Sequence, residues 1–211
     1  SSIATIWKDR VAKHQEYTAQ IPFSDFKVFD FICQNVPKNS QLQVSNSSAI
    51  RYLQLFDLDK SIQVFCNRGT SGIDGSTSTA IGAALATNLP TILITGDISF
   101  LYDSNALWNN YIPKNFKIIL LNNSGGGIFR ILPGHQETET FNRYFETSHQ
   151  LNASHLAKMY GFDYFEANDE ATLQQQYKSF LNQNEKPSIL EIFTPEKENN
   201  GILLEFFRGL K

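Results

Sequence analysis

The sequence predicts an α/β fold, in which a doubly wound, mainly parallel sheet of about six strands carries helices on both faces. Two patterns indicate this. From residue 41 onward, short apolar runs alternate with stretches of helical spacing, as is typical of consecutive βαβ units. Apolar residues make up 41% of the 211-residue chain, which is enough to fill the core of such a fold.

The residues before this alternation predict a helical segment at 1–37, ahead of a domain at 38–211. Ile3 and Trp7 lie at helical spacing. Ser24 can cap a second helical stretch, which Pro37 would end.

The strands and helices of the domain are predicted from apolar runs and from the stretches between them. The predicted strands are 41–46, 61–67, 91–96, 116–123, 162–167 and 188–194. The predicted helices are 47–56, 75–88, 103–111, 151–160 and 169–183. The longest irregular stretch is "SGGGIFRILPGHQE", at 124–137, and a loop of that length in a compact domain is often functional.

Composition excludes some classes of partner and location. The formal net charge is −3, with 18 basic and 21 acidic residues and no basic block, so we expect no nucleic-acid partner. Cys33 and Cys66 both lie in apolar surroundings and predict buried free thiols, which fits a reducing compartment. No apolar run approaches the ~18 residues of a membrane span, and no signal-like segment opens the chain. We therefore expect a soluble, cytoplasmic protein.

Polar residues at the ends of two predicted strands point to a metal site. Asp97 follows one strand and Asn123 ends the next, and a right-handed βαβ crossover would bring them to the same edge of the sheet. Taken alone, Asp97 is as readily a plain helix cap, and a pair of asparagines in a loop is usually a turn. Together they offer the oxygen ligands that Mg²⁺ prefers, and the glycines at 125–127 would let the backbone approach a ligand closely.

Three motifs in this region carry a family resemblance. The segment "GDISFLYDSNALWNNYIPKNFKIILLNNSGGGIF" resembles the thiamine-diphosphate signature, GD followed later by NN, although Ile98 stands where the commonest form has a second glycine. Together with "NRGTSGIDGSTSTAIGAA" and the "NNSGGGIFRILP" loop, it resembles the C-terminal domain of the MenD family, the 2-succinyl-5-enolpyruvyl-6-hydroxy-3-cyclohexene-1-carboxylate synthases. The resemblance covers roughly residues 40–195 and implies the thiamine-diphosphate-binding fold.

The resemblance also implies roles for particular residues. The implied Mg²⁺ ligands, with Mn²⁺ as an alternative metal, are Asp97, Asn123 and the carbonyl of Gly125. The implied contacts to thiamine diphosphate are Ile73, Gly96, Asp97, Ile98, Ser99, Asn123, Gly125, Gly126 and Ile128. The implied contacts to the carboxylate substrates are Ser47, Arg51, Arg68, Ile128, Phe129 and Leu132.

The family resemblance implies an enzyme made of more than these residues. It implies decarboxylation of 2-oxoglutarate and addition of the succinyl unit to isochorismate, in menaquinone biosynthesis. The glutamate that activates the cofactor is expected in a pyrimidine-binding domain of a second subunit, and that domain and a middle domain are not among these residues. We therefore expect a homo-oligomer, and expect the isolated chain to be inactive, with no catalytic residue of its own.

Two alternatives stay open at this point. One is a domain of another thiamine-diphosphate-dependent 2-oxoacid decarboxylase or carboligase. The other is a binding module on the same fold without catalysis. The histidines match none of the motifs, and we expect a surface or structural role for them: His14, His135, His149 and His155. Asp74 and Asp103 are expected to support turns or helices.

Overall fold

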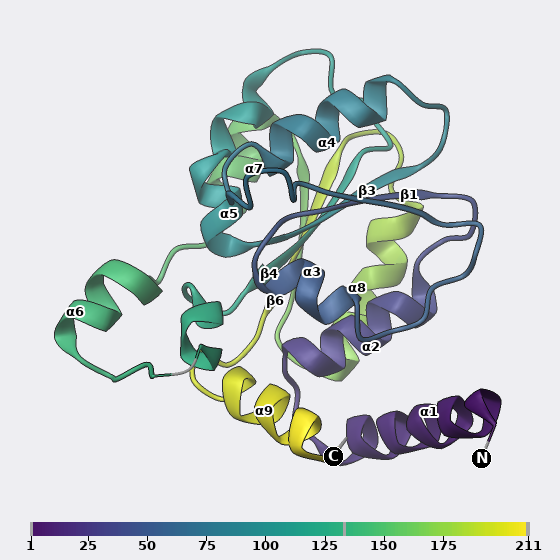
Figure 1. Ribbon diagram of the computed structural model, residues 1–211. Helices are drawn as coiled ribbons and strands as arrows, with labels where there is room; N and C mark the ends of the chain where they lie inside the picture. Colours follow the sequence, from purple (N-terminus) through teal and green to yellow (C-terminus); the bar gives the residue numbers. More distant parts are fainter. Residues whose placement is uncertain (1, 133, 210–211) are drawn as a thin grey trace.

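The computed structural model describes residues 2–132 and 134–209, and within them six strands form one parallel sheet (Figure 1). The strand order is β2-β1-β3-β4-β6-β5. Every pair of neighbours in that order is parallel, which confirms the predicted fold class. The strands are β1 (Gln41–Val44), β2 (Gln63–Cys66), β3 (Thr91–Gly96), β4 (Lys117–Asn122), β5 (Asp163–Ala167) and β6 (Ser188–Phe193).

Helices cover both faces of the sheet (Figure 1). On one face lie α2 (Asp25–Asn35), α3 (Ser48–Leu53), α8 (Glu170–Asn182) and α9 (Asn199–Gly209). On the other lie α4 (Ser76–Leu85), α5 (Asp97–Tyr102), the 3₁₀ helix η1 (Ser104–Trp108) and α7 (Ser154–Tyr160). Side chains alternate between the faces, so Ile92 and Ile94 of β3 pack with the first group while Leu93 packs with the second.

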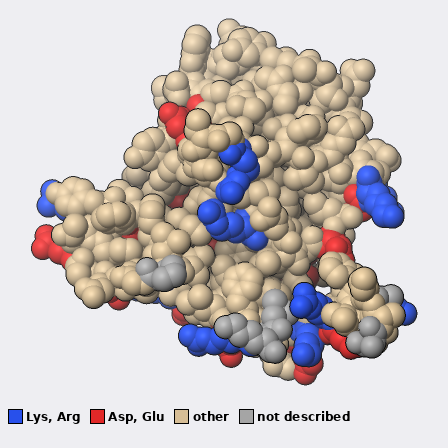
Figure 2. Space-filling model, viewed as in Figure 1, with Lys and Arg blue, Asp and Glu red and all other residues tan. Residues whose placement is uncertain are grey.

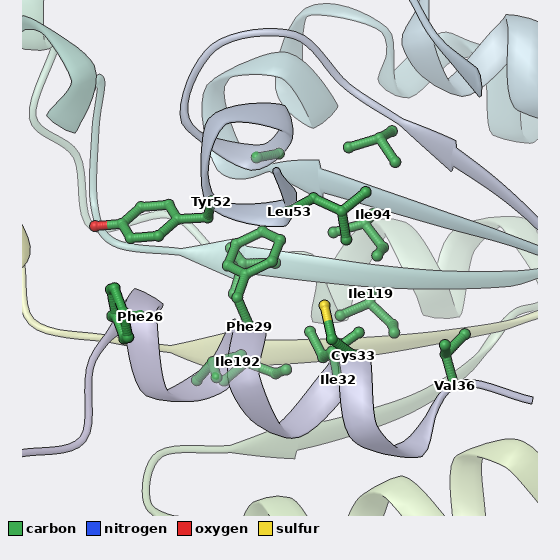
Figure 3. Packing of buried hydrophobic residues seen from close by; sticks show 14 of the residues in the cluster. Phe26, Phe29, Ile32, Cys33, Val36, Tyr52, Leu53, Ile94, Ile119 and Ile192 are labelled. Carbon is green, nitrogen blue, oxygen red and sulfur yellow. The ribbon is translucent and has the colours of Figure 1, made fainter. Parts of the chain in front are cut away.

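The first face holds the more aromatic part of the core (Figure 3). Phe26 and Phe29 of α2 are buried, and the ring of Phe29 stacks on Tyr52 of α3 with centroids 5.3 Å apart. Helix α2 begins at a capping serine, Ser24, whose hydroxyl accepts from the N–H of Lys27. This packing places the first residue of α2, Asp25, under the carboxyl ends of the strands, which matters for the site below.

The N-terminal segment is two helices, α1 (Ile3–Gln20) and α2, and the second begins after Ser24 as predicted. The structure differs from the predicted elements in three places. The helix predicted at 103–111 is only the short η1, because the chain already enters α5 at Asp97. The long loop contains a 3₁₀ turn, η2 (Gly127–Ile131), followed by helical turns α6 (Glu139–Phe141) and η3 (Asn142–Glu146). Helix α9 was not predicted, and the apolar spacing of Ile202, Leu203 and Phe206, which bury its inner face, was the available signal.

One cysteine is less buried than expected. Cys33 is buried on α2, whereas Cys66 is only half-buried, and both thiols are free. Cys66 ends β2, which lies at the edge of the sheet, so no further strand covers its outer side. The other residues of β2 are exposed for the same reason.

Charges are unevenly spread over the face seen in Figure 2. The upper part, over α4, is almost free of Lys, Arg, Asp and Glu, and most charged side chains gather along the lower edge, over α1 and α9. Within residues 2–132 and 134–209, no helix combines the length and the apolar character needed to cross a membrane.

Candidate functional site

The candidate site lies where the strand order reverses. Strand β1 pairs with β2 on one side and with β3 on the other, so the chain changes direction across the sheet at β1. In open α/β sheets, ligands bind beyond the carboxyl ends of the strands at such a switch point. A cavity of about 240 Å³ lies here. The predicted site residues that line it are Ser47, Ile73, Gly96, Asp97, Ile98, Ser99, Asn123, Gly125, Gly126, Ile128 and Phe129.

Asp97 is the buried carboxylate of this cavity. It is the first residue of α5 and only 4% exposed. Its Oδ1 accepts from the N–H of Ile98 at 2.7 Å, and its Oδ2 accepts from the N–H of Gly125 at 2.9 Å. The structure therefore brings two of the predicted metal ligands together through a direct hydrogen bond.

Asn123, the third predicted ligand, follows β4 and is held by a carboxylate from α2. Its Nδ2 donates to Oδ2 of Asp25 at 2.9 Å. Burial raises the pKa of Asp25 to about 6, hydrogen bonds from Thr194 and Asn123 oppose the rise, and the charge of Asp97 adds to it. Two carboxylates thus line one cavity and repel each other, an arrangement that a bound cation would relieve.

The glycine loop is shaped by the chain at 145–148. Gly125 has φ +154°, and a Cβ there would lie 2.8 Å from the carbonyl oxygen of Glu146. The same carbonyl accepts from the N–H of Gly126 at 2.6 Å. Glu146 is itself fixed, because its buried carboxylate pairs with buried Arg130, with Nη2 and Oε2 2.5 Å apart. Only glycine fits at position 125.

His149, for which a surface or structural role was expected, contacts Asp97 although it does not line the cavity. Its Nε2 lies 3.3 Å from Oδ2 of Asp97. Because Nδ1 accepts from the N–H of Leu151 at 3.1 Å, a neutral ring carries its proton on Nε2, toward Asp97. That carboxylate raises the pKa of His149, with burial opposing the rise.

The two predicted substrate arginines lie beside the cavity rather than in its lining. Both side chains are exposed, and both bond to the turn after β1. Arg51 Nη1 donates to the carbonyl of Ser47 at 2.8 Å, and Arg68 Nη1 donates to Oδ1 of Asn46 at 2.7 Å. Ser47 has φ +78°, a left-handed conformation that is strained for a serine. The two guanidinium groups are thus tied to adjacent residues, Asn46 and Ser47, that line the cavity.

The predicted apolar contacts divide into two groups. Ile73, Ile128 and Phe129 are half-buried and line the cavity, whereas Leu132 is 50% exposed and does not. The hydroxyl of Ser99 donates to the carbonyl of Ile73 at 2.5 Å, so it bonds to another predicted cofactor contact.

The donor set suits a hard divalent cation bound together with a phosphate group. Among the residues that the structure describes, no three His, Cys, Asp or Glu side chains are grouped so that they could hold a metal ion by themselves. The cavity instead offers the carboxylate of Asp97, the amide oxygen of Asn123 and backbone carbonyls, with the second carboxylate, Asp25, bonded to Asn123. Mg²⁺ accepts such oxygens and commonly completes its shell with substrate phosphate oxygens. The residues present therefore fit Mg²⁺ carrying a diphosphate.

Asp25 and His149 had no signal in the sequence that linked them to the site. Asp25 stands next to a helix cap, and its partner Asn123 is 98 positions away. His149 follows a short helical turn that no pattern predicted. The roles expected for two other carboxylates are seen: Asp103 accepts from Ser78, and Asp74 accepts from the N–H of Gly75.

Comparison with known families and proteins adds an independent finding. The family described as "Thiamine pyrophosphate enzyme, C-terminal TPP binding domain" matches residues 46–192. This range includes Asp97, Asn123 and Gly125.

Three relatives that match more than nine-tenths of this chain share one name. A protein of Flavobacterium johnsoniae named 2-succinyl-5-enolpyruvyl-6-hydroxy-3-cyclohexene-1-carboxylate synthase is 63% identical over 210 residues, which is 100% of this chain and 38% of that protein. Proteins of the same name are 67% identical in Flavobacterium psychrophilum (97% of this chain, 37% of that protein) and 41% identical in Bacteroides fragilis (91% and 35%). The chain thus spans little more than a third of the length of these relatives.

Proposed function

The chain belongs to the family of C-terminal TPP-binding domains of thiamine pyrophosphate enzymes, and from this premise we propose that it binds Mg²⁺ and the diphosphate of thiamine diphosphate within a MenD-type synthase. The names of its relatives bear out the resemblance to the MenD family. The whole enzyme would decarboxylate 2-oxoglutarate and add the succinyl unit to isochorismate, in menaquinone biosynthesis. One observation carries the proposal most strongly: Asp97, Asn123 and Gly125 surround one cavity at the switch point of a parallel sheet.

The metal would be held by three oxygen donors. These are the carboxylate of Asp97, the amide oxygen of Asn123 and the carbonyl of Gly125, and Mn²⁺ could replace Mg²⁺ in the same oxygen set. Gly96, Ile98, Ser99, Gly126 and the apolar Ile73 and Ile128 would line the rest of the cofactor's place. When bound, thiamine diphosphate supplies the carbon centre at which 2-oxo acids lose carbon dioxide.

The chain's own residues would bind and orient the acidic substrates. Arg51 and Arg68 bring two positive charges next to residues that line the cavity, and an Arg fork matches a carboxylate. Ser47 would bond the same carboxylate, while Phe129 would shield the reacting end from water. This division of charge and apolar surface favours a dicarboxylic 2-oxo acid over pyruvate.

Catalysis would need a partner. We propose that the activating glutamate comes from the pyrimidine-binding domain of a second subunit in a homo-oligomer, so that the segment 1–37 and the domain 38–211 form only the diphosphate-binding part. The 211-residue chain alone should then bind cofactor without turnover.

Calorimetry tests the binding step. Thiamine diphosphate titrated into the 211-residue chain with MgCl₂ should bind, and Asp97→Ala should abolish binding, because the only charged ligand of the metal is lost. Equal affinity in the variant would refute the metal site. Incubation with thiamine diphosphate, Mg²⁺, 2-oxoglutarate and isochorismate should give no product; turnover like that of the longer relatives would refute the need for a partner domain.

A further inference from the structure

The end of β4 carries two consecutive amides, and each donates to a buried carboxylate. Asn122 Nδ2 donates to Oε1 of Glu191 at 2.7 Å, and Asn123 Nδ2 donates to Oδ2 of Asp25 at 2.9 Å. Asn122 Oδ1 in turn accepts from the N–H of Ser124 at 3.1 Å. No residue within 2–132 and 134–209 donates to Oδ1 of Asn123, so this oxygen has no protein partner in the described chain.

Asp25 is held firmly by groups other than Asn123. It is 3% exposed, and its Oδ1 accepts from the hydroxyl of Thr194 at 2.6 Å. Its backbone N–H donates to Oδ1 of Asn199 at 2.8 Å. These bonds join the start of α2 to the end of β6 and the start of α9, so the position of the carboxylate does not depend on its bond to Asn123.

We propose that Asp25 is a positioning residue for the divalent cation: its carboxylate fixes the amide of Asn123 so that Oδ1 faces the cavity. The inference rests on the proposed function, in which Asn123 is a metal ligand. An ionised carboxylate only accepts hydrogen bonds, so the amide nitrogen must face Asp25 and the oxygen must face away. A flipped amide would present two N–H groups to the cation, which they repel.

The proposal assigns part of the metal site to a helix outside the matched family range. Asp25 lies before residues 46–192, and α2 brings it to the cavity through the packing of Phe26 and Phe29. Asp25 and Asp97 also line the same cavity, so the second carboxylate adds negative charge near the cation. Partners that orient metal ligands in this way typically change metal affinity by about 10- to 100-fold when they are removed.

The test compares two carboxylates in matched surroundings. Asp103, the residue before η1, is 4% exposed and does not line the cavity. Its carboxylate accepts from the hydroxyl of Ser78 at 2.6 Å and from the N–H of Ser78 at 2.7 Å. The wild-type chain, Asp25→Asn and Asp103→Asn are titrated with MnCl₂ in the presence of thiamine diphosphate at pH 8, with free Mn²⁺ measured by electron paramagnetic resonance. Circular dichroism gives each Tm without metal.

Asp25→Asn should bind Mn²⁺ about tenfold or more weakly, because an amide at this position can present either oxygen or nitrogen to Asn123. Asp103→Asn should lower Tm and leave Mn²⁺ affinity unchanged. Wild-type affinity in Asp25→Asn would overturn the inference while leaving the proposed function standing; absence of Mn²⁺ binding in the wild type would overturn the proposed function and the inference with it.

A second variant covers the case in which Asp25→Asn does not fold. Thr194→Val removes only the hydroxyl that holds Oδ1 of Asp25 and leaves the carboxylate in place. It should weaken Mn²⁺ binding by less than Asp25→Asn does, and Thr194→Ser should restore it. Unchanged affinity in folded Thr194→Val would count against the inference.

Discussion

Replacing Gly125 by alanine should weaken cofactor binding by changing the shape of the glycine loop, an effect that can be measured apart from any loss of fold stability. Gly125 has φ +154°, a conformation available almost only to glycine. An added Cβ would lie 2.8 Å from the backbone oxygen of Glu146 and 3.3 Å from its Cγ. The oxygen cannot easily move away, because it accepts from the N–H of Gly126 at 2.6 Å.

The size of the effect follows from these contacts. Backbone strain of this kind amounts to about 1–3 kcal/mol, and a loop that relaxes it must move away from Glu146. That movement breaks the bond from the N–H of Gly125 to Oδ2 of Asp97, and a hydrogen bond to a charged group contributes about 1.5–3 kcal/mol. We therefore expect Mg²⁺-dependent binding of thiamine diphosphate to weaken by about 10- to 100-fold.

Calorimetry of thiamine diphosphate with MgCl₂ measures this loss, and Gly161→Ala is the control. Gly161 ends α7 with φ +77°, and an added Cβ there meets nothing within 4 Å, so the control keeps the backbone strain and removes the contact. Gly161→Ala should lower Tm with unchanged affinity. Equal affinities for the two variants would refute the idea that the glycine loop is shaped by Glu146.

Two further variants test the substrate side and the core. Arg51→Ala should raise KM for 2-oxoglutarate about tenfold in the full synthase reaction and leave cofactor binding intact. The control Arg10→Ala, on α1, should leave both KM and cofactor binding unchanged. An unchanged KM in Arg51→Ala would show that Arg51 does not bind the substrate. Buried Lys117 has its pKa lowered from 10.5 to about 8 by burial, so the unfolded chain binds its proton more tightly and the free energy of unfolding should rise with pH between these values. Urea unfolding at several pH values should show this rise of ~3 kcal/mol in the wild type and not in Lys117→Met. An equal dependence of the unfolding free energy on pH in the two proteins would contradict the prediction.

The edge of the sheet at which the candidate site lies could be predicted from the local pattern of apolar and polar residues. Apolar runs such as "TILITG" and "FKIILLNN" specify buried parallel strands, because both faces of such a sheet are covered. Polar residues that end those runs, Asp97 and Asn123, must then emerge at one edge, since parallel strands end together. That geometric rule, with the three motifs, was enough to place the predicted metal ligands around one cavity.

The groups that hold those ligands were decided only by tertiary structure. Asp25 reaches Asn123 because α2 packs its phenylalanines under the sheet, and His149 reaches Asp97 because the chain after η3 returns to the strand ends. Cys66 is half-buried because β2 takes an edge position, which depends on strand order rather than on its apolar neighbours. Such contacts join residues tens of positions apart, and no local periodicity encodes them. They arise when helices and strands bury their apolar faces together. The sequence therefore determined the elements and the residues at the strand ends, and the packing decided which buried carboxylate meets which amide.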